Sequence, residues 1–325
     1  MLQKILNKLK GKSNPKAEWR PVKHSFLNDD ELAEKIHDVG FALAGRLDEN
    51  KLTALRHLYR HLHDFKQPKG GMFYSVYSRD IDYRKKVHEG AGAILKPVYD
   101  NLFHDYKSVL NSFIVKVSGP ESEFSLHQDS TGVDETKYSC LSVWIPLQDT
   151  GTKNGCMCLV PHSHKMFSPY RGISIPAPFS DIAATVRKYL LPLELKAGDI
   201  LLFDNRLVHN SVINQSGSER VVVMSGIFPA EAKLISCYKD AADKNSAVEV
   251  IEQEDDFLLT FQNFNHDCTC RPEVGRTLKM VQWNTEAMSA LLFLNLCNRY
   301  GVREVNHPAV MNSSTAQAII GEPVS

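Results

Sequence analysis

The sequence predicts an antiparallel β-sandwich or barrel with helices at its flanks. In the first third of the chain, apolar residues recur at helical spacing. From about residue 112 onward, short segments have apolar residues at alternate positions, and turn-forming residues separate them. Helices followed by a run of short strands are typical of a sheet core that is flanked by helices. The 325 residues, 43% of them hydrophobic, suit one large domain or one domain with an appendage.

Three helices are expected before the strands. The first begins after the Asn-Asp-Asp at residues 28–30, which can cap its N-terminus. The second is expected over about residues 49–65, where leucines repeat along one face, and the third over about residues 91–106. Residues 68–84 have the composition of a loop. Residues 1–20 are polar and basic, so we expect a flexible lead-in there.

The strand-rich part and the region after it define the expected domain organisation. Residues 21–235 are expected to form the main domain. Residues 236–325 are expected to form a C-terminal helical extension, with a helix over residues 277–300 that packs on the barrel or makes a homodimer contact. The strands are expected at residues 112–117, 138–147, 155–161, 193–196, 199–203, 211–214 and 220–228.

Composition disfavours several classes of partner. Lys plus Arg and Asp plus Glu both number 38, so no overall field favours nucleic acid or an anionic membrane. No apolar run reaches the length of a membrane-spanning helix, and the N-terminus lacks the features of a signal peptide. Seven scattered cysteines are typical of a cytoplasmic protein with reduced thiols. The pairs Cys156/Cys158 and Cys268/Cys270 could form a zinc site only by folding together, and we favour buried thiols at 156 and 158.

A candidate metal site begins with His127 and Asp129 in the sequence SLHQDS. If this stretch is extended, both side chains point to the same face and can bind one ion. His209 follows an apolar strand 80 residues beyond Asp129 and can supply a third ligand. Two histidines and one carboxylate hold Fe(II) and leave coordination positions open, as non-heme oxygenases require.

Arg220 is the candidate anchor for an anionic ligand. It begins the apolar strand VVVMSG eleven residues after His209, and an arginine on a buried strand needs an anionic partner. The planar guanidinium suits the distal carboxylate of 2-oxoglutarate.

Other polar residues are better explained without a metal. His57, His61 and His63 lie on or near the second helix, and solvated surface histidines are the favoured interpretation. Arg171 and the Tyr-rich loop 72–84 could meet a polar substrate, but loop packing, with solvated side chains for the arginines, is favoured. Structural roles are also favoured for His162 and His164, interpreted as part of a turn, for Asp199, a turn residue, and for Asp204 with Arg206, a supporting or surface pair.

Taken together, four motifs resemble the phytanoyl-CoA dioxygenase-like family of non-heme iron oxygenases. They are HQD, KNGCMCLVPHSHK, AGDILLFDNRLVHNS and the ER at 219–220, in the order and spacing of that family, and the resemblance covers about residues 30–230. It implies a double-stranded β-helix, a jelly-roll barrel of cupin type. It implies that His127, Asp129 and His209 bind iron, and that Arg220 and Ser211 bind 2-oxoglutarate. Trp144 would line the cosubstrate pocket, and Lys116 would be a further carboxylate contact.

The resemblance also implies an activity. The enzyme would use Fe(II), 2-oxoglutarate and dioxygen to hydroxylate a small organic substrate, with an amino acid or secondary metabolite favoured. Halogenating members of the family have Gly or Ala in place of the carboxylate, so Asp129 predicts oxygenation and not chlorination. The alternatives are a peptide or acyl-CoA hydroxylase, and a non-catalytic jelly-roll protein that binds a metal or small molecule.

Overall fold

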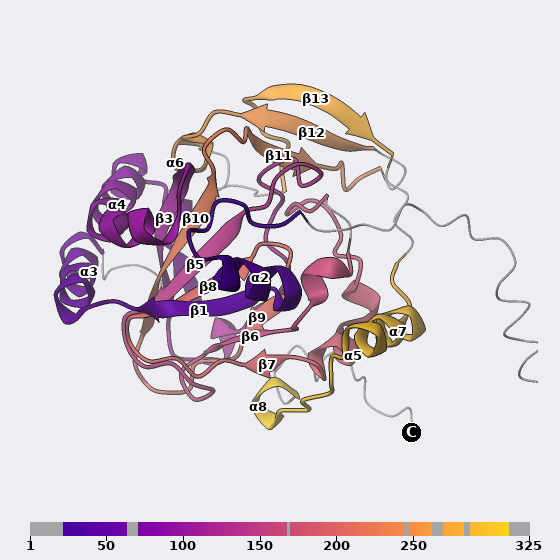
Figure 1. Cartoon of the computed structure of the whole chain (residues 1–325), viewed down its shortest axis with the longest axis horizontal. Coiled ribbons are helices and arrows are strands. Elements are labelled where there is room, and N and C mark those ends of the chain that lie inside the picture. The colour runs from indigo at the N-terminus through magenta and orange to yellow at the C-terminus, as the bar shows by residue number, and fades with distance from the viewer. Residues whose placement is uncertain are drawn as a thin grey trace, which may run out of the picture.

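The protein folds into a double-stranded β-helix, in which a six-stranded and a four-stranded antiparallel sheet pack face to face (Figure 1). The computed structural model describes residues 22–63, 71–167, 170–243, 247–261, 269–282 and 287–311. The predicted lead-in, residues 1–20, lies outside the described residues. The predicted fold class is confirmed by this arrangement of antiparallel strands.

The larger sheet has the strand order β1-β8-β5-β10-β3-β2. Strand β10 pairs with β3 on one side and with β5 on the other. Its valine run, residues 221–223, suits this central place, because β-branched side chains pack well on a pleated surface. The strands are Phe41–Arg46 (β1), Met72–Tyr74 (β2), Tyr106–Lys116 (β3), Leu141–Pro146 (β5), Asp199–Asp204 (β8) and Arg220–Pro229 (β10).

The smaller sheet has the strand order β4-β9-β6-β7 and carries the candidate metal ligands. Its strands are Phe124–His127 (β4), His209–Ser211 (β9), Met157–Leu159 (β6) and Leu191–Pro192 (β7). His209 therefore lies in a strand, whereas the sequence predicted a strand only from residue 211. The strand predicted at 193–196 was wrong: β7 ends at Pro192, and Leu195 makes an isolated bridge with Thr150. Trp144, Leu201 and Val222 from the larger sheet meet Met157 and Leu159 in one buried apolar cluster between the sheets.

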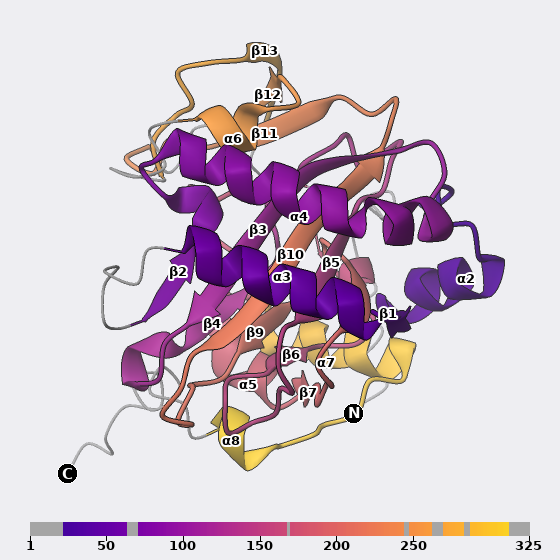
Figure 2. The ribbon, with the colours of Figure 1, turned by 90° about the vertical axis from the view of Figure 1, so that its left-hand side faces the viewer.

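Helices α3 (Glu49–Leu62) and α4 (Ile81–Leu102) lie across the outer face of the six-stranded sheet (Figure 2). Apolar side chains of both helices join those of β5 and β10 in the largest buried cluster. The third helix was predicted to begin at about residue 91 and to end at about 106, and both limits were wrong. Residues 81–84, predicted as loop, instead form the first turn of α4. Within α4, Gly90 lets the helix approach α3, because a Cβ there would come within 2.8 Å of Leu58.

The remaining short elements connect these layers. Helix α2 (Asp30–Val39) begins as predicted, and the carboxylate of Asp29 caps it by accepting a hydrogen bond from Leu32 N. Helix α3 ends at Leu62, and the predicted helical residue Phe65 lies outside the described residues. The other short helices are η1 (Ser75–Tyr77), η2 (Pro120–Ser122), η3 (Ser163–Lys165), η4 (Ser180–Ile182) and α5 (Ala183–Arg187).

The C-terminal region differs from the predicted helical extension. A three-stranded antiparallel sheet, β11-β12-β13, covers one end of the barrel (Figure 1). Its strand β13 occupies residues that were predicted to begin a helix, because pairing with β12 outweighs a weak helical pattern. The elements are Leu234–Tyr238 (β11), Val248–Gln253 (β12), Phe257–Thr260 (α6), Arg276–Val281 (β13), Ala290–Tyr300 (α7) and Pro308–Met311 (α8).

Helix α7 packs on the barrel, which is one of the two predicted alternatives. Phe293 and Cys297 are buried, and the Phe293 ring meets Tyr189 edge-on with 5.4 Å between centroids. Leu291 and Leu292 are exposed on the same helix. Among the described residues, no helix combines the length and the apolar character needed to cross a lipid bilayer.

Candidate metal centre

The structure brings together the three side chains that the sequence predicts as metal ligands. His127 ends β4 and His209 begins β9, and the two are direct partners in the antiparallel register. Asp129 follows two residues after β4. Its Oδ1 lies 3.8 Å from Nε2 of His127 and 3.8 Å from Nε2 of His209. One metal ion can therefore be reached by all three, since their ligand atoms lie within 4.8 Å of one another.

Backbone contacts orient both imidazoles. Nδ1 of His127 lies 2.8 Å from the carbonyl of Ser125, and Nδ1 of His209 lies 2.9 Å from the carbonyl of Leu207. A carbonyl can only accept, so each Nδ1 carries the proton and each Nε2 keeps its lone pair for a metal. Burial, followed by the proximity of His209, lowers the pKa of His127 well below its usual value. The neutral form that a metal requires is thus favoured.

The Asp129 carboxylate is held so that one oxygen faces the histidines. Its Oδ2 accepts a hydrogen bond of 2.9 Å from the Ser142 hydroxyl on β5. Its backbone N–H donates to the carbonyl of Asn205, 3.0 Å away, in the turn between β8 and β9. Oδ1 is the oxygen closest to both imidazoles, so the contacts leave it available as a single-oxygen ligand.

Arg220 is a buried cation whose guanidinium lacks an acceptor. It is 1% exposed, and among the described residues neither Nε nor Nη1 has a hydrogen-bond partner. The Trp144 ring lies 5.4 Å from Cζ of Arg220. Burial lowers the pKa of Arg220 to about 10, which still leaves it charged at neutral pH. Because a buried unpaired charge is costly, this geometry calls for an anionic ligand.

Ser211 and Lys116 lie on the strands next to Arg220 and the ligands. Ser211 is two residues beyond His209 in β9, so both side chains point to the same face. Lys116 is the direct partner of Arg220 in the β3–β10 register. Its Nζ donates to the backbone carbonyls of Ser122, Ser211 and Val212, and burial, followed by Arg220, lowers its pKa to about 6. The carboxylate contact expected of Lys116 stays a prediction, since its described contacts are all with carbonyls.

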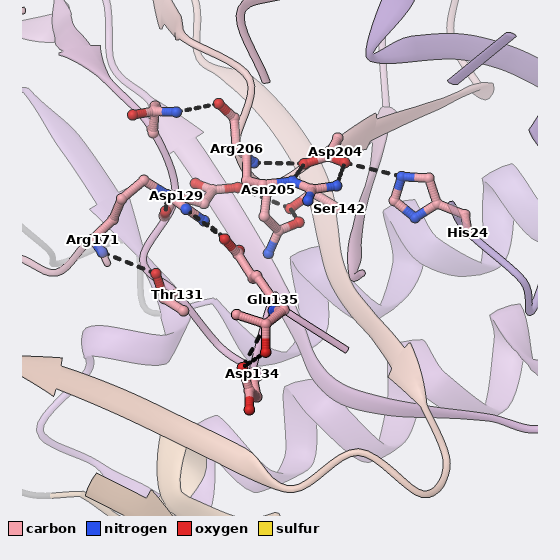
Figure 3. A network of polar contacts seen from close by, with 12 residues as sticks. His24, Asp129, Thr131, Asp134, Glu135, Ser142, Arg171, Asp204, Asn205 and Arg206 are labelled. Atoms are coloured by element: carbon pink, nitrogen blue, oxygen red, sulfur yellow. Dashed lines mark hydrogen bonds and ion pairs between the residues drawn. The ribbon is translucent and has the colours of Figure 1, made fainter. Parts of the chain in front are cut away.

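A buried polar network supports residues 129–135, the metal segment, which begins with the candidate ligand Asp129 (Figure 3). Arg171 forms a two-pronged ion pair with Glu135, with contacts of 2.8 and 2.7 Å. The favoured interpretation of Arg171 as a solvated side chain was therefore wrong, since it is buried. Asp204 pairs with Arg206, and its Oδ2 lies 3.0 Å from Nε2 of His24. The Asp204–Arg206 pair is therefore a buried support and not a surface pair.

The sequence interpretation missed Ser142, Asn205 and Glu135. Each is buried, with an exposed fraction of 7% or less. Ser142 could have been found, because it is a polar residue between the apolar residues of a predicted buried strand, CLSVWIP. A buried polar side chain needs a hydrogen-bond partner. Nothing in the local sequence distinguishes Glu135 from a surface carboxylate.

The other candidate ligands lie away from this centre. Within the described ranges, His127, Asp129 and His209 form the one group of three or more candidate metal ligands. His162 and His164 contact the carbonyls of Asp38 and His37, as expected of a structural turn. Cys156 and Cys158 are buried, as predicted, and Cys270 is exposed. Cys268 lies outside the described residues.

A cavity of about 170 Å³ lies beside the network and not at the metal ligands. Its lining includes Thr131 and Glu135 from the metal segment and Lys279 from β13. None of the three candidate ligands lines it, so we do not assign the reaction to this cavity.

Comparison with known proteins agrees with the sequence resemblance. The family model for phytanoyl-CoA dioxygenase (PhyH) matches residues 30–222. Phytanoyl-CoA dioxygenase 1 of Oryza sativa subsp. japonica is 31% identical over 138 residues, which cover 40% of this chain and 47% of the rice protein. A phytanoyl-CoA dioxygenase domain-containing protein 1 homolog of Dictyostelium discoideum is 26% identical over 209 residues, 62% of this chain and 69% of that protein. The match thus spans about half the length of the rice relative.

Solved structures with a related arrangement are more distant. The epimerase SnoN, in complex with Fe3+, alpha-ketoglutarate and nogalamycin RO, has 18% identity and a TM-score of 0.48. The match covers 77% of this chain and 95% of SnoN. HygX from Streptomyces hygroscopicus, with nickel, 2-oxoglutarate and hygromycin B bound, has 16% identity and a TM-score of 0.44, and the match covers 62% of this chain and 88% of HygX.

Proposed function

Because this chain belongs to the phytanoyl-CoA dioxygenase family, we propose that it is a non-heme oxygenase that uses Fe(II), 2-oxoglutarate and dioxygen to hydroxylate a small organic substrate. The observation that carries the proposal is the joint presence of a two-histidine, one-carboxylate cluster and an acceptor-free buried Arg220. A metal-binding protein without this chemistry would need the cluster but has no use for the unpaired cation.

The donor set fits Fe(II). Two neutral imidazole nitrogens and one carboxylate oxygen would hold Fe(II) and leave it able to bind small ligands as well. Serine and backbone groups fix the carboxylate and both rings, as the outer contacts of metal ligands usually do. When bound, iron with 2-oxoglutarate and dioxygen supplies the oxidising power, and the protein supplies orientation and exclusion of water.

In this proposal, Arg220 binds the distal carboxylate of 2-oxoglutarate. The guanidinium can donate in parallel from two nitrogens to the two carboxylate oxygens, which satisfies the buried donors that lack an acceptor. Trp144 packs against the guanidinium and limits its rotation. Ser211, on the same face of β9 as His209, would add a hydroxyl contact to the cosubstrate.

An aromatic row beside His127 supports a small organic substrate. The Phe124 ring lies 4.2 Å from the His127 ring, the Tyr74 ring 5.6 Å from Phe124, and the Tyr77 ring 5.5 Å from Tyr74. Tyr77 is 41% exposed, so the row leads from the metal cluster toward solvent. Such rings bind flat or apolar groups, and we propose an amino acid or secondary metabolite as the substrate class.

The wider organisation of the chain completes the proposal. Residues 21–235 would form the oxygenase domain, and the C-terminal residues would cover the barrel. A homodimer through α7 stays a prediction, for which Leu291 and Leu292 provide the exposed apolar side chains. We expect a cytoplasmic location, with neither nucleic acid nor membrane as a partner.

The test is turnover of 2-oxoglutarate by protein loaded anaerobically with Fe(II) and then exposed to air. Succinate should form, and a panel of amino acids, natural products, acyl-CoA esters and peptides should identify the substrate that accelerates its formation. Arg220→Ala serves as the comparison protein. Metal binding without succinate formation under any condition would leave a non-catalytic binding protein and overturn the proposal.

A further inference from the structure

We propose that Arg171 and Glu135 act as positioning residues that hold the main chain of Asp129 where its carboxylate can bind the metal. The inference rests on the metal centre of the proposed function but not on the reaction. Asp129 lies beyond the end of β4, so strand pairing does not fix it. Contacts from other elements must do so.

Arg171 binds Asp129 through one nitrogen of its guanidinium and Glu135 through the other two. Nε donates a 2.8 Å hydrogen bond to the carbonyl oxygen of Asp129. Nη1 and Nη2 donate to the two carboxylate oxygens of Glu135. The guanidinium is planar, so fixing two of its nitrogens on Glu135 also fixes the direction of Nε. Figure 3 shows Arg171 and Glu135 lying next to Asp129.

The backbone of Arg171 is tied to the same segment. Its N–H donates to Oγ1 of Thr131, 2.9 Å away, and its carbonyl accepts a hydrogen bond of 3.1 Å from the N–H of Thr131. Residue 171 therefore contacts residues 129 and 131 at once. A movement of this loop would shift Asp129 directly.

The pair also meets an electrostatic requirement. A lone guanidinium next to Asp129 would repel a divalent cation, because burial weakens screening. Glu135, 2% exposed, balances that charge. The pair thus supplies a rigid donor to the Asp129 carbonyl without adding net positive charge.

The test measures metal affinity, with Co(II) as the probe and its absorption spectrum as the readout. Arg171→Lys keeps the charge but cannot supply a fixed fork and a third donor together. We expect the Co(II) dissociation constant to rise by about 10- to 100-fold, the range typical of contacts that orient metal ligands. The ligand-field bands should also change, because the Asp129 oxygen moves.

A matched control is available in Arg187→Lys. Arg187 forms another buried pair, with Glu123, in which Nη1 lies 3.0 Å from Oε1 and both side chains are at most 5% exposed. This ion pair joins two side chains that are not metal ligands. The control should lose thermal stability much as Arg171→Lys does, while its Co(II) dissociation constant stays within about twofold of the unmodified protein, since this pair does not hold the main chain of Asp129.

A second variant separates positioning from folding. Arg171→Met with Glu135→Leu removes both charges and fills the space, a replacement that often preserves stability. It should regain a normal melting temperature and still bind Co(II) weakly. Normal Co(II) affinity and an unchanged spectrum in either the lysine or the double variant would overturn the inference. If the unmodified protein binds Co(II) but never forms succinate, the proposed function fails while this test still stands.

Discussion

Two regions beside the metal cluster each contain a buried arginine, and their surroundings differ. Arg220 begins β10 and is 1% exposed, and its Nε and Nη1 have no partner among the described residues. Arg171 lies in a connecting loop, is 6% exposed, and is matched at both terminal nitrogens by Glu135. Similar burial with opposite pairing indicates opposite roles. An unmatched buried cation marks a place for a ligand, whereas a matched one belongs to the architecture.

The pKa values of the two arginines also differ according to whether a carboxylate lies beside them. Burial lowers the pKa of Arg220 to about 10, since no carboxylate opposes the loss of solvation. Burial alone would lower the pKa of Arg171 too, but the Glu135 carboxylate raises it overall above the usual value. The folded chain therefore carries an electrostatic cost in the Arg220 region that an anion can relieve.

The largest expected effect comes from removing a ligand that both regions serve. His209→Ala should abolish Co(II) binding at micromolar concentrations and eliminate 2-oxoglutarate turnover, because two remaining donors hold a divalent ion poorly. Metal titration and succinate formation measure the two effects. Retention of tight binding would mean that these three side chains are not the metal site.

Next in size is a difference in stability between the two arginines. Arg171→Met should lower the free energy of unfolding by about 3–5 kcal/mol, because it leaves Glu135 buried without a partner. Arg220→Met should change it little, or raise it, because it removes a charge that already lacks a partner. Urea denaturation without metal or cosubstrate measures both. Equal losses of unfolding free energy in the two variants would contradict the opposite roles assigned to the two arginines.

For the affinity for 2-oxoglutarate the order is reversed: substitution of Arg220 should have the larger effect and substitution of Arg171 the smaller. Arg220→Ala removes a charge-assisted contact of roughly 1.5–3 kcal/mol, so the KM for 2-oxoglutarate should rise by about 10- to 150-fold. Arg171→Lys, assayed at saturating metal, should leave this KM nearly unchanged. Succinate formation against 2-oxoglutarate concentration gives both values. A KM that rises only in the Arg171 variant would reverse the assignment of roles.

The two regions also differ in how far the sequence could predict them. His127, Asp129, His209 and Arg220 were found because residue types suited to iron and 2-oxoglutarate occur next to strands, in a family-like order. The Arg171–Glu135 pair was not found, since its members are 36 residues apart and belong to no motif. Only the fold places them together.

Errors in the fold prediction have a similar origin. Residues 81–84 were predicted as loop, yet they begin α4, which packs with α3 on the six-stranded sheet. Strand β13 is defined by its pairing with β12, and its own sequence has a weak helical pattern. Local patterns therefore predicted the strands of the barrel core, which alternate clearly, better than elements whose conformation depends on distant partners.

The free energy of unfolding should depend on pH, and measuring it over a pH series also tests the stability difference between the two arginine variants. Burial lowers the pKa of His164 to about 4, whereas an unfolded histidine has a pKa of about 6.5. Between these values the unfolded chain binds a proton that the folded chain does not, so stability is lost as pH falls below about 6.5, by roughly 1.4 kcal/mol at about pH 5.5. His164→Gln should reduce this slope, and His24 and His127, whose pKa values burial also lowers, should keep part of it. Both arginines stay charged over the range, so their difference should persist, and a difference that vanished at low pH would contradict their assignment.

The smallest expected effect is that of chloride, which should not change the product of the unmodified enzyme. Ser142 and the backbone of Asn205 hold Asp129 with one oxygen toward the histidines, so in the proposed site the carboxylate would fill a position that chloride could otherwise take. With saturating chloride and an accepted substrate, mass spectrometry should detect oxygenated product alone. Asp129→Gly removes the carboxylate that the Arg171 region positions but leaves Arg220 intact, so any chloride dependence should appear only in that variant. Chlorinated product from the unmodified enzyme would mean that Asp129 does not fill a coordination position, and the positioning role of Arg171 would fail with it.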